Sequence, residues 1–196
     1  MSDSDDPDDN DDTAGPPGSP APGGGRRAGA SRQSPGRLAR AAARLAGVQA
    51  LYQMEVSGAA WTDVRDEFET YRLGSEIEGL RYPDPDLDLF RDILEGVQAG
   101  QIPIDQLTDR ALIARWPLGR IDATLRALFR AAGFELVGRP DVPVRVVIGE
   151  YVEVAKAFFG EGREPRFVNG VLDHMAREAR PGALEAPAPK PDRRAD

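Results

Sequence analysis

The sequence has no cysteine and only one histidine, His174, among its 196 residues. Without cysteine the chain cannot form a disulfide, a thiolate metal site or a thiol nucleophile, and a single histidine excludes a histidine-rich metal cluster. No run of about eighteen apolar residues is present, so no segment is predicted to span a membrane. The acidic start, MSDSDDPDDNDD, has neither the positive charge nor the apolar stretch of a signal peptide. These absences predict a cytoplasmic protein.

The common catalytic and cofactor-binding motifs are also missing. The sequence has no GxxxxGKS/T phosphate loop, no GxGxxG after a strand, no HExxH and no GxSxG elbow. The acidic stretch DPDLD, 84–88, lacks the glycine and the distal glutamate of an EF-hand loop, so we interpret it as solvated acids. We interpret His174 as a surface residue near the end of a helix. The sequence thus predicts no enzyme activity, no metal site and no cofactor.

Charge is unevenly distributed along the chain. The net charge is −8, but residues 1–25 alone hold seven aspartates and no basic residue, which leaves −1 for the rest. Six arginines and no acidic residue follow between 26 and 54. Local patches decide whether a surface binds a polyanion, more than the whole-chain sum does. The arginine-rich stretch is therefore a candidate for contact with nucleic acid.

Composition divides the chain into a core and two tails. Residues 1–36 are rich in Asp, Gly, Pro and Ser, and residues 181–196 are similarly low in complexity. Such segments bury too little apolar surface to offset the entropy lost on ordering. We therefore predict disordered tails at 1–36 and 181–196 and one ordered domain over 37–180.

Apolar residues inside this domain recur at the spacing of helices. In the first segment Leu38, Leu45 and Tyr52 recur every seven residues, and the pair Ser57-Gly58 predicts the end of the helix. A second, weaker helix is predicted from residue 61 to about residue 73. The sequence therefore starts with two helices in succession.

Proline and aspartate mark the further helix starts. Asp84 and Pro85 predict the start of a third helix, Pro103 opens a fourth, and this one must end before Pro117. Apolar stripes predict three more helices, over about 121–136, 144–158 and 165–176. The stretch VPVRVVI has strand propensity, but the longer helical period around it prevails. About seven helices and no convincing strand predict an all-α, compact helical bundle.

Three arginines of the first helix, Arg37, Arg40 and Arg44, fall within about 60° of one another at about 100° per residue. Their planar guanidinium groups match phosphate geometry and also stack on bases, which suits single-stranded RNA. A merely solvated helix start is the alternative, and spacing alone does not choose between the two. For Tyr52, a buried ring with an exposed hydroxyl is the simplest interpretation.

The stretch REPRFVNGVLDHMA, 163–176, is a second candidate. Pro165 predicts a helix start, where free N–H groups attract anions, and an arginine lies on either side of it. Phe167 either stacks on a base or belongs to the core, and the residues alone leave both open. We interpret the pair Asn169-Gly170 as structural, with Gly170 allowing a close contact between helices.

Five stretches of the sequence together resemble one known family. They are ARLAGVQALYQME (43–55), FRDILEGV (90–97), RAAGFEL (130–136), RPDVPVRVVIGEYVEVAKAF (139–158) and FVNGVLD (167–173). In order and spacing they resemble the NusB family of transcription antitermination proteins, over roughly residues 38–179. A NusB-like domain also precedes the catalytic domain of an rRNA cytosine methyltransferase, but no cofactor-binding module follows FVNGVLD here, so the length favours NusB itself.

The resemblance implies an all-α fold of two small helical subdomains. It implies binding to the boxA element of nascent ribosomal-RNA leader transcripts, jointly with the small-subunit ribosomal protein NusE and within the antitermination complex on RNA polymerase. By analogy with the family, the expected RNA-binding residues are Arg37, Arg40, Arg44, Gln49, Tyr52, Arg166 and Phe167. Some members form homodimers that hide the RNA face, so a second copy of the chain is a further candidate partner.

Gly149 departs from the family, in which asparagine is common at this position, and a glycine weakens a helix by roughly 1 kcal/mol relative to alanine. Two alternatives to the antitermination role are a helical adaptor that mainly holds NusE and an RNA-binding module related to the methyltransferases. The acidic residues 1–25 are expected to compete with RNA for the neighbouring arginines. The alternative is that they only keep the protein in solution.

Overall fold

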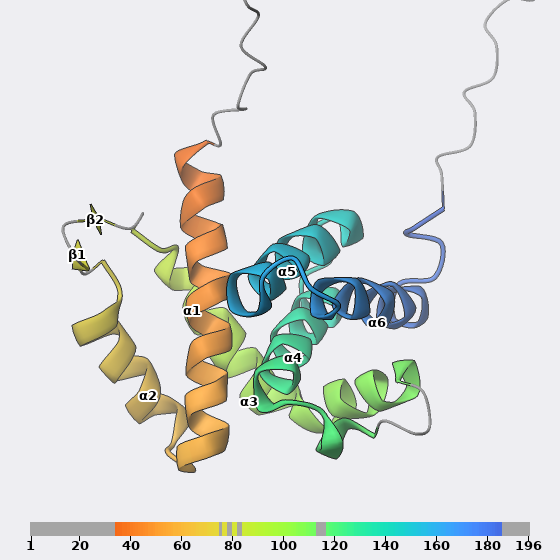
Figure 1. Cartoon of the computed structure of the whole chain (residues 1–196), viewed down its shortest axis with the longest axis horizontal. Helices are drawn as coiled ribbons and strands as arrows, with labels where there is room; N and C mark the ends of the chain where they lie inside the picture. Colours follow the sequence, from red (N-terminus) through yellow and green to blue (C-terminus); the bar gives the residue numbers. More distant parts are fainter. Residues whose placement is uncertain (1–33, 75, 78–79, 82–83, 113–116, 186–196) are drawn as a thin grey trace, which may run out of the picture. The chain divides into compact units, whose positions relative to one another are not determined.

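Six α-helices make up most of the computed structural model, which describes residues 34–74, 76–77, 80–81, 84–112 and 117–185 (Figure 1). They are α1 (Pro35–Ser57), α2 (Trp61–Glu67), α3 (Leu87–Ala111), α4 (Ala123–Gly138), α5 (Val144–Phe159) and α6 (Glu164–Ala179). The predicted all-α class is confirmed. Residues 1–33 and 186–196, which hold most of the two predicted tails, lie outside the described residues.

Helix α1 starts with Pro35 in its first turn and ends where the sequence predicts, at Ser57. Gly58 takes a left-handed conformation with φ of 69°, and its N–H donates to the Met54 carbonyl at 2.9 Å. A residue with a side chain would be strained in this conformation, which is why glycine ends the helix.

The buried face of α1 differs from the predicted one. Small residues line it, and a Cβ built on Gly47 would lie 3.1 Å from the Ile93 side chain of α3. Leu38 and Tyr52, the two ends of the predicted stripe, are exposed. The expectation that this stripe forms the core is therefore wrong at both ends, because small residues let α1 approach its neighbours closely on another face.

Helix α3 merges two predicted helices into one. It continues through Pro103 to Ala111, with a kink at Gly100, where φ is −116° and ψ is 18°. Proline has no N–H for the helical ladder and its ring crowds the preceding turn, so a kink just before Pro103 has an evident cause. Asp86, and not Asp84, caps the helix by accepting a hydrogen bond from the Leu89 N–H at 3.1 Å. Counted on either side of the kink, the described helices number seven.

The last three helices form as predicted. Asp122 caps α4 by accepting from the Thr124 N–H at 2.8 Å, and Pro143 precedes α5. The stretch VPVRVVI is helical, and the apolar stripe of α6 is buried. Helix α4 lies at the centre, in contact with α1, α3, α5 and α6 (Figure 1). These contacts join the described residues from 34 to 185 into one unit.

A short antiparallel hairpin, β1 (Glu76–Ile77) with β2 (Leu80–Arg81), was not predicted. Each strand has only two residues, which is too short for a period of two to stand out in a sequence. The hairpin follows α2 and a π-helical turn at Phe68–Arg72, on the side of α1 away from α5 (Figure 1). None of the described helices is long and apolar enough to cross a membrane.

Close contacts between helices occur at other glycines than expected. A Cβ on Gly170 would meet no atom within 4 Å, so the interpretation of this glycine as a close helix contact is wrong. Gly96 of α3 has this role, since a Cβ there would lie 2.0 Å from the Phe134 ring of α4. The close approach of α3 to α4 therefore depends on the missing side chain.

Candidate nucleic-acid interface

Arg44 is a buried structural residue. Only 3% of its surface is exposed, and its Nε and Nη2 donate to the two carboxylate oxygens of Glu135, each at 2.8 Å. The Tyr151 hydroxyl donates to the same carboxylate at 2.9 Å. Burial lowers the pKa of Arg44, but the hydrogen bond and the charge of Glu135 outweigh this effect and raise the pKa above its usual value. Arg44 thus joins α1 to α4 and does not offer its guanidinium to a phosphate.

The other two arginines of the predicted group, Arg37 and Arg40, lie beside different parts of the fold. Arg37 is half-exposed, and its Nε lies 3.1 Å from a carboxylate oxygen of Glu150 on α5. Arg40 is exposed and lines a small hollow with Asp86, which caps α3, and Asp92 of α3. No ion pair of Arg40 with another described residue is formed. The predicted group of three arginines therefore leaves two that can reach a ligand, each beside negative charge.

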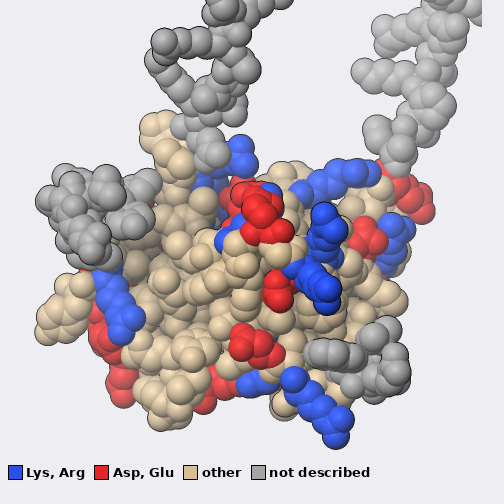
Figure 2. Space-filling view, viewed as in Figure 1, with Lys and Arg blue, Asp and Glu red and all other residues tan. Residues whose placement is uncertain are grey.

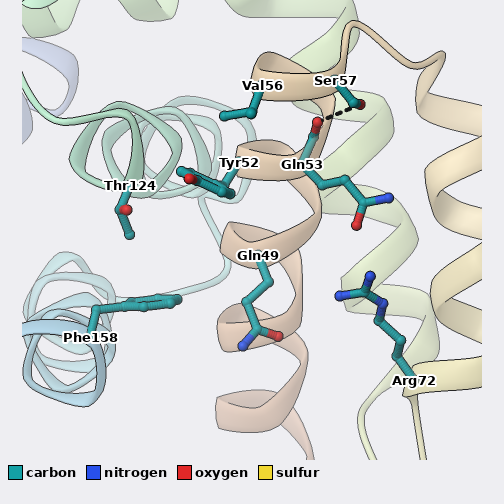
Figure 3. A pocket seen from close by; sticks show the side chains of 8 residues that line it. All are labelled: Gln49, Tyr52, Gln53, Val56, Ser57, Arg72, Thr124 and Phe158. Atoms are coloured by element: carbon teal, nitrogen blue, oxygen red, sulfur yellow. Dashed lines mark hydrogen bonds between the residues drawn. The ribbon is translucent and has the colours of Figure 1, made fainter.

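Gln49 and Tyr52 lie together at a hollow of about 480 Å³, which we call the aromatic pocket. The residues that line it come from α1, α4, α5 and the π-helical turn, and are Gln49, Tyr52, Gln53, Val56, Ser57, Arg72, Thr124 and Phe158. Tyr52 is 40% exposed and Phe158 is 36% exposed. In Figure 3, Phe158 extends from α5 toward α1, and Tyr52 extends from α1 toward α4. The pocket therefore has accessible aromatic rings from two helices.

Phe167 lines a second hollow of about 530 Å³, which we call the apolar groove. It lies among the starts of α4 and α6 and the end of α5, and its lining residues are Ile121, Asp122, Leu125, Phe159, Arg163, Glu164 and Phe167. The Phe167 ring meets the buried Phe129 ring edge to face, with centroids 6.0 Å apart. Both interpretations of Phe167 thus hold in part, because the ring rests on the core and also borders the groove.

The two hollows are neighbours. Thr124 and Phe158 line the aromatic pocket, and the residues that follow them in the chain, Leu125 and Phe159, line the apolar groove. Gln49, Tyr52 and Phe167 therefore line adjoining hollows. Arg166 is an exposed residue of α6 that precedes Phe167 and lines neither of the two. Arg40 lines a different hollow, against α3.

Three arginines that line the apolar groove or adjoin its lining residues in sequence have no carboxylate partner among the described residues. Arg163 lines the groove, Arg120 precedes Ile121, and Arg166 precedes Phe167. Most other described arginines are neutralised, as Arg177 is by Asp173 and Arg139 by Asp92 and Asp141. Figure 2 shows basic side chains in separate groups with acidic side chains between them. Arg163 therefore brings an unpaired positive charge to a groove whose lining also includes Asp122 and Glu164.

Ion pairs fix the start of α4, which borders both hollows. Glu55 near the end of α1 pairs with Arg126 and Arg130 of α4, and Arg130 also pairs with Asp105 of α3. Arg126 donates in addition to the Ile121 carbonyl just before α4. These bonds tie three helices together where the pocket and the groove meet, so the two hollows keep their positions relative to each other.

Sequence reasoning missed Phe158 and Arg120 as surface residues of this region. The spacing of Phe158 from Tyr151 and Ala155 predicted a core residue, but Phe159 takes the more buried place. Two adjacent phenylalanines at a helix end cannot both face inward, since neighbours on a helix differ by about 100°. No feature of the sequence singled out Arg120, because only the structure shows which arginines have carboxylate partners. Arg26, Arg27 and Arg32, the other three arginines of the arginine-rich stretch, lie outside the described residues.

Comparison with known proteins assigns the chain to a family. The model of the NusB family matches residues 41–177. A transcription antitermination protein NusB from Agrobacterium fabrum is 52% identical over 141 residues, covering 72% of this chain and 85% of the relative. One from Nitrobacter hamburgensis is 54% identical over 143 residues, covering 73% and 89%.

Solved structures show the same fold. A structure of NusB from T. maritima superimposes with a TM-score of 0.60 at 30% identity, covering 75% of this chain and 97% of that chain. A chain in a crystal structure of antitermination factors NusB and NusE in complex with dsRNA gives a TM-score of 0.55 at 17% identity, covering 70% and 96%. The fold, the extent of the match and the identity to curated relatives agree: this chain belongs to the NusB family.

Proposed function

We propose that this chain is a transcription antitermination factor that binds boxA RNA of nascent ribosomal-RNA transcripts together with NusE. The single observation that carries the proposal is the unpaired Arg163 that lines the apolar groove, with the unpaired Arg120 and Arg166 next in sequence to two of its lining residues. Phosphates provide the negatively charged partners that these arginines lack within the described residues, while a base or ribose covers the apolar surface beside Phe167. Arg37 and Arg40 offer further cations on α1, and Arg44 holds α1 in place.

Family membership supports the same function. The curated relatives are transcription antitermination proteins, and one solved relative is seen with NusE and RNA. We propose that this chain likewise joins the antitermination complex on RNA polymerase, in the cytoplasm, and acts by binding and not by catalysis. A second copy of the chain is a further candidate partner for this surface, and the same binding measurements, made over a range of protein concentrations, test it.

Removal of the unpaired arginines tests the proposal. We expect the variant Arg163→Ala/Arg166→Ala to bind boxA RNA several-fold more weakly at low salt. The slope of log affinity against log salt should become shallower by about 0.7 for each phosphate that the variant no longer neutralises. Fluorescence anisotropy with labelled RNA between about 50 and 200 mM salt measures both quantities.

Arg177→Ala is the matched control, because Arg177 is an exposed arginine of the same helix whose charge Asp173 already neutralises. It should leave affinity and slope nearly unchanged. If the double variant behaves like this control, the groove does not bind RNA. The reversal Arg40→Glu is a usable second test, whereas Arg44→Glu would place two carboxylates together in the core and unfold the chain.

A helical adaptor for NusE is the second candidate, and the apolar lining of the groove favours it. Capture of NusE by the chain in the absence of RNA separates the two functions. If the chain is an adaptor, it captures NusE without RNA, and the arginine substitutions leave RNA binding unchanged. If it is an RNA-binding factor, the double variant Arg163→Ala/Arg166→Ala binds RNA more weakly.

A further inference from the structure

One carboxylate near the end of α1, that of Glu55, bonds α1 to α4 where the aromatic pocket and the apolar groove adjoin. We propose that Glu55 is a positioning residue of the RNA interface, which acts through Arg126 and keeps the two hollows at the spacing that one RNA strand requires. The inference rests on the proposed RNA-binding function. It adds a residue on which the preference for an RNA sequence depends, although Glu55 lines neither hollow.

Arg126 of α4 connects Glu55 to the edge of the apolar groove. Its Nε donates to the Glu55 carboxylate at 2.7 Å, and its Nη2 donates to the same oxygen. Its Nη1 donates to the carbonyl of Ile121, which lines the groove and comes just before Asp122, the cap of α4. One guanidinium thus bonds the end of α1 and the chain that enters α4. The planar fork of arginine makes this double role possible.

Glu55 and Arg126 lie next in sequence to residues that line the two hollows. Val56 follows Glu55 and lines the aromatic pocket, and Leu125 precedes Arg126 and lines the apolar groove. A shift of α1 along α4 would therefore change the distance between the hollows. Groups that bind one ligand together must be held within about 0.5 Å of the productive arrangement. The bond between Glu55 and Arg126 supplies such a constraint.

The cluster around Glu55 balances its charges and is largely shielded from water. Arg130 donates from its Nη1 to the second carboxylate oxygen of Glu55 at 2.6 Å, and to Asp105 of α3 at 2.8 and 2.9 Å. The side chains of Arg126 and Arg130 are only 19% and 14% exposed. Salt screens partly buried pairs less than exposed ones. The cluster therefore keeps its geometry while salt weakens the contacts of exposed arginines with phosphates.

Charge alone and positioning predict opposite effects of removing this carboxylate. Glu55→Gln keeps the size of the side chain, removes one negative charge near the interface and takes the carboxylate partner from Arg126. By charge alone, any RNA should then bind more tightly. By positioning, an RNA sequence that fits both hollows should bind more weakly, because it alone depends on their spacing.

Two RNAs of the same composition test the proposal. The probes are a labelled boxA RNA and the same nucleotides in scrambled order, and fluorescence anisotropy with the full chain gives the ratio of their affinities, which we call the boxA preference. Glu55→Gln should lower the boxA preference about three- to tenfold, through weaker binding of boxA RNA. The salt slope for boxA RNA should not become shallower, since no arginine that meets a phosphate is removed.

Glu69→Gln is the matched control. Glu69 also bonds an arginine of another element, accepting from Arg91 of α3 at 2.8 and 2.7 Å, and its side chain is 22% exposed against 23% for Glu55. Glu69 lines neither hollow. This variant should keep the boxA preference of the wild type. Thermal melting compares the stability of both variants, so a preference lost only with Glu55→Gln is not a consequence of weaker folding.

A double-mutant cycle identifies Arg126 as the link. Arg126→Gln should lower the boxA preference as Glu55→Gln does, and the two changes together should lower it no further, because the two residues act as one unit. Arg126→Lys keeps the positive charge beside Glu55, but one ammonium does not replace a fork that also bonds the Ile121 carbonyl. This variant should lose part of the preference, and it decides the question if Glu55→Gln does not fold.

Failure of this inference and failure of the proposed function give different results. Equal affinity of the wild-type chain for boxA and scrambled RNA, with and without NusE, overturns the proposed function. A wild-type chain that prefers boxA RNA, together with Glu55→Gln or Arg126→Lys variants that keep this preference, overturns the positioning role and leaves the function standing. If Glu55→Gln binds both RNAs more tightly by the same factor, Glu55 acts through its charge alone and the inference is wrong.

Discussion

Arg44 illustrates how a single residue can follow the surface pattern of a helix and still be buried. Its spacing from Arg37 and Arg40 predicts one shared face, but its partner Glu135 lies 91 positions away in the sequence. Taking a guanidinium out of water is unfavourable unless a well-placed carboxylate compensates its charge. The bidentate bond to Glu135 supplies this compensation and turns a candidate ligand-binding residue into a structural one.

Tyr151, in the same cluster, makes the stability of the folded state depend on pH. Burial raises the pKa of the Tyr151 hydroxyl well above its ordinary value of about 10, and the charge of Glu135 raises it further. The folded state therefore holds this proton more tightly than the unfolded chain. Its contribution to stability is fully present below about pH 10 and is lost as the pH rises from there toward the pKa of the folded state.

We expect Tyr151→Phe to be less stable than the wild type at pH 7 by about 1.5–3 kcal/mol, because Glu135 loses a buried hydrogen bond. Above about pH 10 this difference should shrink, by up to about 1.4 kcal/mol per pH unit. Urea denaturation from pH 7 to 11 measures it. A gap of constant size across this range would contradict the role of Tyr151, and Tyr71→Phe on an exposed ring is the control.

At the scale of elements, the periodicity of apolar residues was sufficient for α4, α5 and α6. Their buried stripes repeat over four turns, so Leu128, Tyr151 and Leu172 could be placed in the core from sequence. Helix α1 could not be oriented in this way, because most of its buried residues, such as Ala43 and Gly47, are small and hydrophobicity ranks them low. The kink of α3 was predicted as a break between two helices, since a proline does not reveal whether a helix continues beyond it.

The candidate interface was predictable only in part for a related reason. Gln49 and Tyr52 follow from the family resemblance, and the structure places both at one pocket. The partners that bury Arg44 and the lack of partners around Arg163 are long-range facts of the fold. The spacing of residues along one helix does not predict such contacts, so only the structure shows which arginines form ion pairs.

Two glycines of different helices make the packing argument testable. Gly96 of α3 faces the Phe134 ring, and a Cβ there would lie 2.0 Å from it, whereas Gly149 of α5 faces open space. We expect Gly96→Ala to destabilise the fold by about 1–3 kcal/mol, because the ring must move. Gly149→Ala should stabilise it by about 0.5–1 kcal/mol, since alanine favours the helix and meets no neighbour. Thermal or urea denaturation of both variants decides the matter, and shifts of the same sign would refute this account.

The whole molecule separates its charges along the chain. Residues 1–25 carry −7, and the following arginines, from Arg26 to Arg44, include the two on α1 that remain accessible, Arg37 and Arg40. Structurally, residues 1–25 lie outside the described residues, and their composition alone predicts a disordered segment. We expect a segment of this composition to reach the arginines that RNA would use and its aspartates to compete with phosphate for them.

Deletion of residues 1–25 should therefore tighten the binding of boxA RNA at about 50 mM salt, roughly three- to tenfold. The gain should fade toward about 0.5 M salt, because ions then screen charges that are more than a few ångströms apart. A chain with the seven aspartates replaced by asparagine keeps the length and loses the charge, so it should show the same gain. Equal affinity of all three proteins at low salt would mean that the acidic segment does not reach the arginines. A gain for the deletion alone would show that the segment hinders RNA by its bulk and not by its charge.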